Sequence, residues 1–275
     1  NYTNQGGNDL IPLEQSVELA RVATNKALAI DPDFALAAAQ MGWHAMSFDS
    51  DLVTAARHFE RAFRLDPSNL DIIRNVSQLT SFLGRLDDAI LLGEYVTARD
   101  PLNVPGHISL GGFYLGAGRL DDALRSNEIA LSLSPERIGG HYFVGSTLLL
   151  MGQAAEALAA FSREADDEYR VRGSALAFYT LGQLAEYEAA RTELAERWGE
   201  RWPSSIAETY AWAGDSDSAF TWLDKELETS GNLNGISQNP YFLSLHDDPR
   251  WEPLLEKAGV SPEQLAAIEF NITLP

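Results

Sequence analysis

The sequence predicts an all-α fold, a superhelix of stacked antiparallel helix hairpins (an α-solenoid), and three observations support it. The phrase GRLDDA occurs twice, at Gly84–Ala89 and Gly118–Ala123, with its two starts 34 residues apart. Prolines recur at nearly the same interval, at Pro32, Pro67, Pro101 and Pro135. An alanine stands twelve residues before each of them, at Ala20, Ala55, Ala89 and Ala123. A period of this length is typical of arrays in which each repeat is one helical hairpin.

Each predicted unit consists of a first helix, a short turn and a second helix. Proline cannot continue the hydrogen-bond ladder of a helix, so each recurring proline separates one unit from the next. The glycine that opens each GRLDDA phrase suits the left-handed conformation that ends a helix. The aspartates that follow are expected near the N-terminus of the second helix, where capping and the helix dipole favour them. Gly111 on a first helix and Ala123 on a second helix are small enough to let the two helices approach closely.

The period divides the chain into three parts. Residues 1–168 are predicted to form the array, a partial first unit followed by about four regular units. Residues 12–32 match only the second half of a unit, so their partner is expected at or before Asn1–Leu10, with an irregular partner formed by NYTNQGGNDL as the alternative. Residues 169–232 are interpreted as degenerate hairpins, and residues 233–275 as a C-terminal capping segment. Because the chain begins with Asn1, we expect a processed product or a piece of a longer protein.

Composition excludes several classes of function. The chain has 275 residues, of which 45% are hydrophobic, and a formal net charge of −20. Phosphate binding requires clustered Lys and Arg, so we expect no nucleic-acid partner and no anionic membrane surface. The absence of cysteine excludes disulfide scaffolds and thiolate metal sites. No run of about 18 apolar residues occurs, so we expect no membrane insertion by this region.

The repeated positions resemble those of tetratricopeptide (TPR) repeats. The third unit carries the pattern at Leu110, Gly111, Tyr114, Ala123, Ala130 and Pro135, and the first unit carries it at Met41, Gly42, Ala55, Phe59, Ala62 and Pro67. The resemblance covers about residues 12–168. It implies a right-handed superhelix whose concave groove is lined by first helices. It also implies that a peptide or protein segment binds in that groove.

Mapping the phase of the repeat onto this chain gives the candidate groove residues. The partner-binding candidates are Trp43, Arg74, Asn75, Gln78, Phe82, Ile108, Tyr142 and Ser146, and further lining positions are Leu36, Ala39, Met46, Asp71, Gly112, Leu115 and Leu149. Some TPR proteins clamp a C-terminal carboxylate with residues from successive helices, and Arg74 and Asn75 resemble part of that clamp. We therefore predict a non-enzymatic protein-interaction module. A self-association module that forms a homodimer is the alternative.

The sequence offers no motif for catalysis or cofactor binding. It contains no HExxH zinc motif, no GxxxxGK[ST] phosphate loop and no GxSxG nucleophile elbow. Adjacent carboxylates on a helix point about 100° apart, which does not build an acid–base pair across a pocket. We therefore predict no enzyme, no cofactor and no metal site. The aromatic residues of the last third are expected to form core that seals the open end of the stack, with a small-ligand or enzymatic site as a second alternative.

A second resemblance concerns the C-terminal part, roughly residues 175–275. The phrases AETYAWAGDSDSAFTWLDK and NPYFLSLHDDPRWEPLLEKAG look like the end of TPR regions in bacterial TolB-like and winged-helix (CadC-like) regulators and in class III adenylate cyclase-type signalling proteins. The resemblance implies the sensory or regulatory part of a larger bacterial signalling or transcription-regulating protein. It favours the periplasmic side of a membrane-anchored protein over the cytoplasm.

Overall fold

The structure is a computed structural model that describes residues 13–275, and all regular secondary structure in this range is helical. The partner expected at Asn1–Leu10 lies outside the described residues. The array runs through α2 (Leu13–Ile30), α3 (Ala35–Ser47), α4 (Leu52–Leu65), α5 (Leu70–Phe82), α6 (Leu86–Arg99), α7 (Val104–Gly116), α8 (Leu120–Leu133), α9 (Gly140–Leu150) and α10 (Ala154–Phe161). The degenerate range holds α11 (Asp167–Thr180), α12 (Leu184–Trp198), α13 (Pro203–Trp212) and α14 (Ser216–Thr229). The C-terminal segment (residues 233–275) holds η1 (Ile236–Gln238), η2 (Pro240–Leu245), α15 (Trp251–Ala258) and α16 (Pro262–Ala266).

The predicted turns and close helix crossings are confirmed. Gly84 and Gly118 adopt φ values of 77° and 71°, in the left-handed region that favours glycine, so the two GRLDDA phrases build the same turn twice. The alanines twelve residues before the prolines pack at the helix crossings, where Ala55, Ala89 and Ala123 are all 0% exposed. Gly111 is buried against the side chain of Asn127 on α8. These small residues set the spacing of each hairpin.

The aspartates of the GRLDDA phrases lie near the N-termini of the second helices as predicted, but they do not cap them. Arg85 and Arg119 occupy the N-cap positions of α6 and α8, and neither makes a side-chain capping hydrogen bond. Asp87 and Asp88 lie two and three residues after the N-cap Arg85, in the first turn of α6, where a negative charge favours the helix through its dipole. True side-chain caps occur elsewhere, for example at Asp215, whose carboxylate accepts from the backbone N–H of Ser218 at 3.1 Å.

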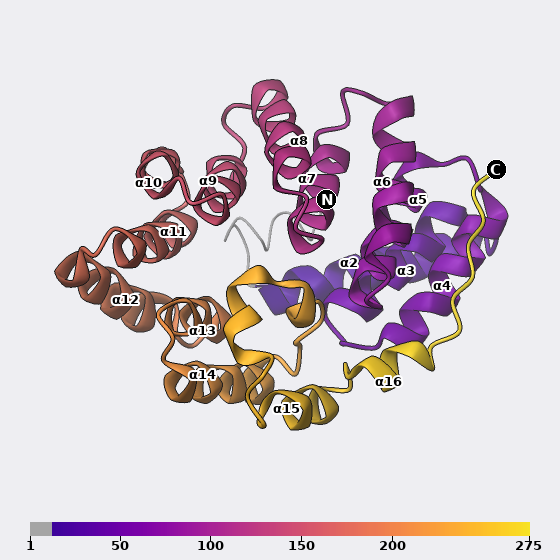
Figure 1. Cartoon of the computed structure of the whole chain (residues 1–275). Coiled ribbons are helices and arrows are strands. Elements are labelled where there is room, and N and C mark those ends of the chain that lie inside the picture. The colour runs from indigo at the N-terminus through magenta and orange to yellow at the C-terminus, as the bar shows by residue number, and fades with distance from the viewer. Residues whose placement is uncertain (1–12) are drawn as a thin grey trace.

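The C-terminal segment joins the last hairpins to the first units. Figure 1 shows the yellow end of the chain passing α16 and returning alongside the violet helices of the first units. Arg85 on the α5–α6 turn donates hydrogen bonds to the backbone oxygens of Phe270 (2.7 Å) and Ile268 (3.1 Å). One core cluster contains buried residues from both the first units (residues 38–96) and the end of the chain (residues 207–270). The sequence predicts a cap on the last hairpin, and the structure adds a contact with the beginning of the array.

The aromatic residues of the last third mostly pack as core. Trp251 and Phe220 are buried in the shared core cluster, and Trp222 packs against its edge. Trp202 is the exception among these, with 36% of its surface exposed. No helix within residues 13–275 combines the length and the apolar character needed to cross a membrane.

Candidate functional site

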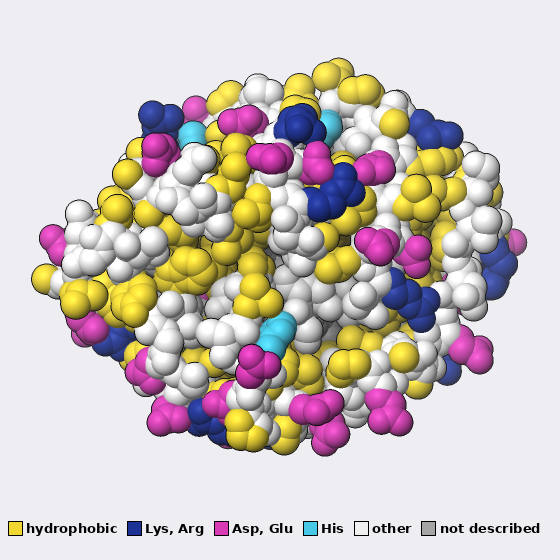
Figure 2. All heavy atoms as spheres, viewed as in Figure 1, with side chains coloured by type: hydrophobic (Ala, Val, Ile, Leu, Met, Phe, Trp, Pro, Cys, Tyr) yellow, Lys and Arg dark blue, Asp and Glu magenta, His cyan; other side chains and the backbone are white. Residues whose placement is uncertain are grey.

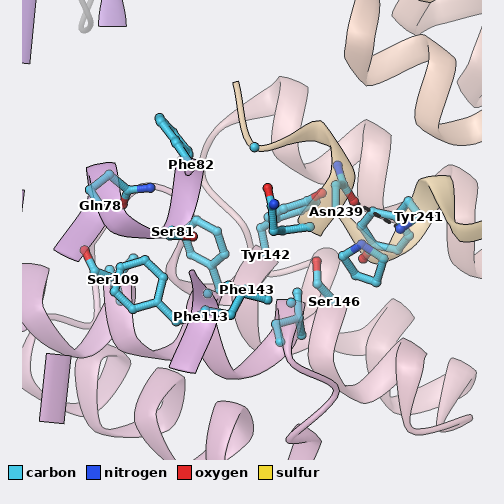
Figure 3. A pocket seen from close by; sticks show the side chains of 18 of the residues that line it. Gln78, Ser81, Phe82, Ser109, Phe113, Tyr142, Phe143, Ser146, Asn239 and Tyr241 are labelled. Atoms are coloured by element: carbon cyan, nitrogen blue, oxygen red, sulfur yellow. Dashed lines mark hydrogen bonds between the residues drawn. The ribbon is translucent and has the colours of Figure 1, made fainter. Parts of the chain in front are cut away.

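A pocket of about 370 Å³ lies on the concave side of the array, and we call it the central pocket. Successive first helices, α5, α7, α9, α11 and α13, supply most of its lining, and residues 235–241 of the C-terminal segment supply the rest. Figure 2 shows the hollow at the centre of this face, with hydrophobic side chains around it. In Figure 3, Gln78, Phe82 and Ser109 lie at one end, Ser146, Asn239 and Tyr241 lie at the other, and Phe113, Phe143 and Tyr142 lie between them.

The structure brings together part of the predicted site. The predicted residues that line the central pocket are Gln78, Phe82, Ile108, Tyr142 and Ser146, together with Gly112 and Leu115 from the wider set. These residues come from three successive first helices, as the phase of the repeat predicts.

Three of the partner-binding candidates lie outside the central pocket. Trp43 packs against the core cluster that the first units share with the C-terminal segment. Arg74 and Asn75 sit one turn before Gln78 on α5 and are not among the lining residues. Their Nε and Oδ1 atoms are buried without hydrogen-bond partners. The partial carboxylate clamp predicted from these two residues is therefore not assembled in this pocket.

The wider set of lining positions contains errors. Ala39, Met46 and Leu149 are each no more than 2% exposed, so they are core residues that face neighbouring helices. Leu36 is 43% exposed at the start of α3, and the exposed Asp71 stands at the start of α5. Neither Leu36 nor Asp71 lines the central pocket.

Several lining residues were missed by sequence reasoning. Phe113 and Phe143 belong to the regular units and follow directly on predicted positions along α7 and α9. Tyr169, Arg172, Glu208 and residues 235–241 lie beyond the region in which the period is regular. No local pattern in the sequence indicates that residues 235–241 contact α5 and α7.

Arg172 on α11 forms the charged end of the central pocket. Its Nε lies 3.3 Å from Oε1 of Glu168, and its Nη1 lies 3.4 Å from Oε2 of Glu208. The three side chains are only 13%, 7% and 8% exposed, so this is a desolvated ionic group with a formal charge of −1. The guanidinium also lies 4.5 Å from the ring centroid of Tyr142 and 5.0 Å from that of Tyr169. Cation–π contacts of this kind add to the stability of a buried guanidinium.

Glu208 links this ionic group to the C-terminal segment. Its Oε1 accepts a hydrogen bond of 2.7 Å from Nδ2 of Asn239. Burial raises the pKa of Glu208, while Arg172 and the Asn239 amide oppose that rise by favouring the carboxylate. The C-terminal segment is therefore held at the pocket by a charge-assisted hydrogen bond.

Two hydroxyl groups of the pocket lining, on Ser146 and Tyr241, lack hydrogen-bond partners. Ser146 is 1% exposed and Tyr241 is 4% exposed, and neither Ser146 Oγ nor Tyr241 Oη has a hydrogen-bond partner of acceptable geometry. Burial raises the pKa of Tyr241, and the nearby hydroxyls of Ser146 and Tyr142 reduce that effect only in part. The ring of Tyr241 packs edge-on against Trp212, with 5.6 Å between the ring centroids. Both hydroxyls therefore stay protonated at neutral pH and can each donate and accept a hydrogen bond.

Gly112 marks the open floor of the pocket. Apart from its chain neighbours and the nearby backbone of α7, no heavy atom would lie within 4 Å of a Cβ atom added at Gly112. At Gly116, one turn later, an added Cβ would lie 3.1 Å from the backbone oxygen of Gln238. The free space therefore lies over the middle of α7, and the C-terminal segment covers its end.

The described lining holds neither an activated nucleophile nor a metal-binding group. Ser146 has no hydrogen-bonded base, so nothing in the described lining activates it as a nucleophile. Within residues 13–275, no group of three or more His, Cys, Asp or Glu side chains is placed to hold a metal ion. The pocket combines aromatic walls, one paired guanidinium and unpaired neutral hydroxyls.

Solved structures share this fold. A thermophilic TPR protein of Thermus thermophilus matches with a TM-score of 0.57 at 19% identity, over 70% of this chain and 99% of its own. PilW, a widely conserved type IV pilus biogenesis factor, matches with a TM-score of 0.58 at 17% identity, over 72% of this chain and 92% of its own. A tetratricopeptide repeat protein from Parabacteroides merdae ATCC 43184 covers 86% of this chain and 94% of its own, with a TM-score of 0.51 and 16% identity.

Sequence comparison adds no relative, since neither a protein-family model nor a curated protein matches the chain. The structural matches nevertheless confirm the predicted fold class, an all-α right-handed superhelix of the TPR type.

Proposed function

We propose that this chain is a non-enzymatic protein-interaction module that binds a short segment of a partner protein in the central pocket. One observation carries the proposal. Side chains from five first helices and from residues 235–241 converge on one concave pocket that contains buried, unpaired hydrogen-bonding atoms. A buried hydroxyl without a partner costs free energy, and a bound ligand that supplies the partner recovers it. The TPR-type fold, a scaffold for protein–protein interaction, supports the same function.

The C-terminal segment limits the length of what binds. Four of its apolar side chains, Leu233, Ile236, Phe242 and Leu245, are each no more than 6% exposed. Each side chain of this kind contributes roughly 1.5–3 kcal/mol through burial, so the segment is not displaced by a weakly binding partner. Since residues 235–241 cross the concave face, a chain end or a short loop fits the remaining space better than a long extended strand.

A wider role follows from the resemblance of the C-terminal phrases to those of bacterial regulators. We propose that the chain is the sensory or regulatory part of a larger signalling or transcription-regulating protein, held on the periplasmic side of a membrane. The measurement is a blot of native cell fractions with an antibody against this region. A band well above 30 kDa in the membrane fraction is expected. A soluble band near 30 kDa would contradict the proposal and indicate a free-standing adaptor.

The binding function is tested by filling the pocket. Peptides selected from a random-peptide display library on the wild-type chain are expected to lose binding to Gly112→Trp, because the indole enters the open space over α7. Ser132→Trp, at an exposed position on α8 outside the pocket, is the matched control and is expected to keep binding. Selected peptides that bind Gly112→Trp as well as the wild type would place the interaction elsewhere. A library that yields no binder would overturn the proposal.

The homodimer remains the competing interpretation from the sequence. Sedimentation velocity over a wide range of protein concentrations separates it from partner binding. A sedimentation coefficient that does not change with concentration is expected for the interaction module. A concentration-dependent shift toward a dimer, abolished by substitutions outside the central pocket, would favour self-association.

A further inference from the structure

We infer that the central pocket recognises one tyrosine side chain of the partner segment, with the phenol hydroxyl at Ser146 and Tyr241. This inference rests on the proposed function and specifies what the pocket selects. It follows from four features of the pocket: its unpaired atoms, its walls, its charge and its size.

The unpaired atoms favour a neutral ligand group that both donates and accepts a hydrogen bond. Ser146 Oγ and Tyr241 Oη are both buried and without a hydrogen-bond partner, and both residues line the pocket. A hydroxyl both donates and accepts, so a ligand hydroxyl between them can accept from one and donate to the other. Oε1 of Gln238, a third buried and unpaired atom of the lining, is an acceptor on the same C-terminal segment.

The walls favour an aromatic ring. Phe113 and Tyr142 are 3% and 5% exposed, and the rings of Phe82, Phe143 and Tyr169 complete the lining. Aromatic rings pack against one another in tilted and edge-to-face arrangements, as Tyr142 and Tyr169 already do at 4.9 Å and 40°. A ligand ring entering over Gly112 extends this packing.

The charges exclude an ionised ligand. The guanidinium of Arg172 is already paired with Glu168 and Glu208, so a ligand carboxylate gains no free cation there and meets two carboxylates instead. A ligand ammonium would have to lose its hydration to enter this desolvated aromatic pocket. A neutral phenol avoids both costs, whereas phosphorylation of that phenol would add a charge that the pocket repels.

The size limits how much of the partner segment enters. A volume of about 370 Å³ stands near the lower end of ligand pockets, which run from roughly 300 to 1,000 Å³. The backbone of Gln238 lies close to Gly116, whereas the space over Gly112 is free. The pocket therefore has room for one large side chain and its neighbouring backbone, but not for a long segment.

The test uses calorimetric titration of the full chain with N-acetyl-L-tyrosinamide and N-acetyl-L-phenylalaninamide, which differ by one hydroxyl. The tyrosine probe is expected to bind at least about tenfold more tightly, because its hydroxyl makes hydrogen bonds with Ser146 and Tyr241 that the phenylalanine probe leaves unmade. Ser146→Ala is expected to reduce this preference, since only the hydroxyl of Tyr241 remains, while the phenylalanine probe binds as before. Gly112→Leu is expected to abolish binding of both probes, and Ser132→Trp, outside the pocket, is expected to change neither.

Two further titrations test whether the pocket accepts a tyrosine within a peptide and whether it rejects a charged phenol. The peptide acetyl-Gly-Gly-Tyr-Gly-Gly-amide is expected to bind at least as tightly as the single-residue probe, and its O-phosphorylated form is expected not to bind. If only the single-residue probe binds, the pocket is a small-molecule site and the inference is overturned. Equal binding of the tyrosine and phenylalanine probes also overturns it. If library peptides without tyrosine are lost in Gly112→Trp while both probes fail to bind, this inference falls and the proposed function stands.

Discussion

Two adjacent glycines on α7 should respond in opposite ways to the same substitution. Gly111 and Gly112 both lie inside the helix, and alanine is preferred over glycine there by roughly 0.5–1 kcal/mol. At Gly112 an added Cβ meets no heavy atom within 4 Å, so Gly112→Ala gains this amount without a clash. At Gly111 the added Cβ would lie 2.1 Å from Oδ1 and 2.7 Å from Cγ of Asn127.

The cost at Gly111 follows from the surroundings of Asn127. This side chain is 3% exposed, and its Nδ2 donates to the backbone oxygen of Phe143 (3.4 Å) and to Oγ1 of Thr147 (3.3 Å). Moving it away costs roughly 1–3 kcal/mol in overpacking and about 1 kcal/mol in hydrogen bonding. After the helix gain, Gly111→Ala should destabilise by about 2 kcal/mol, so the two variants should differ by about 3 kcal/mol.

Urea denaturation followed by far-ultraviolet circular dichroism measures the difference. The midpoint should rise for Gly112→Ala and fall for Gly111→Ala, with the same dependence on urea concentration in both. The wild type measured in parallel is the reference. Midpoints that move together, or in the reverse order, would refute both the assignment of Gly111 to the helix crossing and that of Gly112 to open space.

Three other substitutions test separate parts of the structure. Ala123→Leu, at a position that is 0% exposed, should destabilise by roughly 1–3 kcal/mol in the same urea assay, and an unchanged midpoint would mean that the helix crossing is loose. Ser146→Ala should be neutral or stabilising by about 1 kcal/mol because it removes an unpaired hydroxyl, whereas Ser126→Ala, whose hydroxyl donates to a backbone oxygen at 2.9 Å, should cost about 1 kcal/mol; equal effects would contradict the assignment of the unpaired atom. Hydrogen bonds from Ser218 lower the pKa of Asp215 below its usual 3.8, so its carboxylate stabilises the fold above that pH and this contribution is lost as the pH falls through the lowered value. Asp215→Ala should therefore cost about 1 kcal/mol at pH 7 and progressively less below pH 3.8, and a cost independent of pH would refute the capping role.

Sequence periodicity was sufficient for the hairpins because the same contacts recur at the same spacing. Ala55, Ala89 and Ala123 fall at one helix crossing in successive units, so one position in the period predicts all three. The same phase placed Gln78 and Tyr142 on the concave face, where both line the central pocket.

Periodicity was insufficient where, of two neighbouring positions on a helix, one lines the groove and the other is buried in the core. The phase also assigned Met46 and Leu149 to the groove, yet both face neighbouring helices and are core. A period of 34 residues fixes which helix a residue belongs to, but the small rotation between units decides which of two adjacent faces meets solvent. Pattern alone does not contain that rotation.

The rest of the site could not be predicted because it depends on contacts between residues far apart in the chain. Glu208 meets Asn239 across a separation of 31 residues, and Arg85 meets Phe270 across 185 residues. Each contact involves at least one residue beyond the region of regular period, so no recurring position in the sequence predicts it. Arg172 illustrates the difficulty, since an arginine on a degenerate helix resembles a surface residue until Glu168 and Glu208 are seen around it.

The C-terminal segment connects the stability of the array to the shape of the pocket. Ile236 and Phe242 are part of the core that spans the first and last units, while Gln238 and Tyr241 between them line the central pocket. In an open solenoid each unit contacts only its neighbours, so a groove can widen by small rotations spread over many units. Here the hydrogen bonds from Arg85 to residues 268 and 270 connect the two ends, and such rotations are opposed by the shared core. If the pocket binds a segment of a partner as proposed, this shared core limits the rearrangement of its lining, and a site that needs little rearrangement binds at a smaller entropic cost.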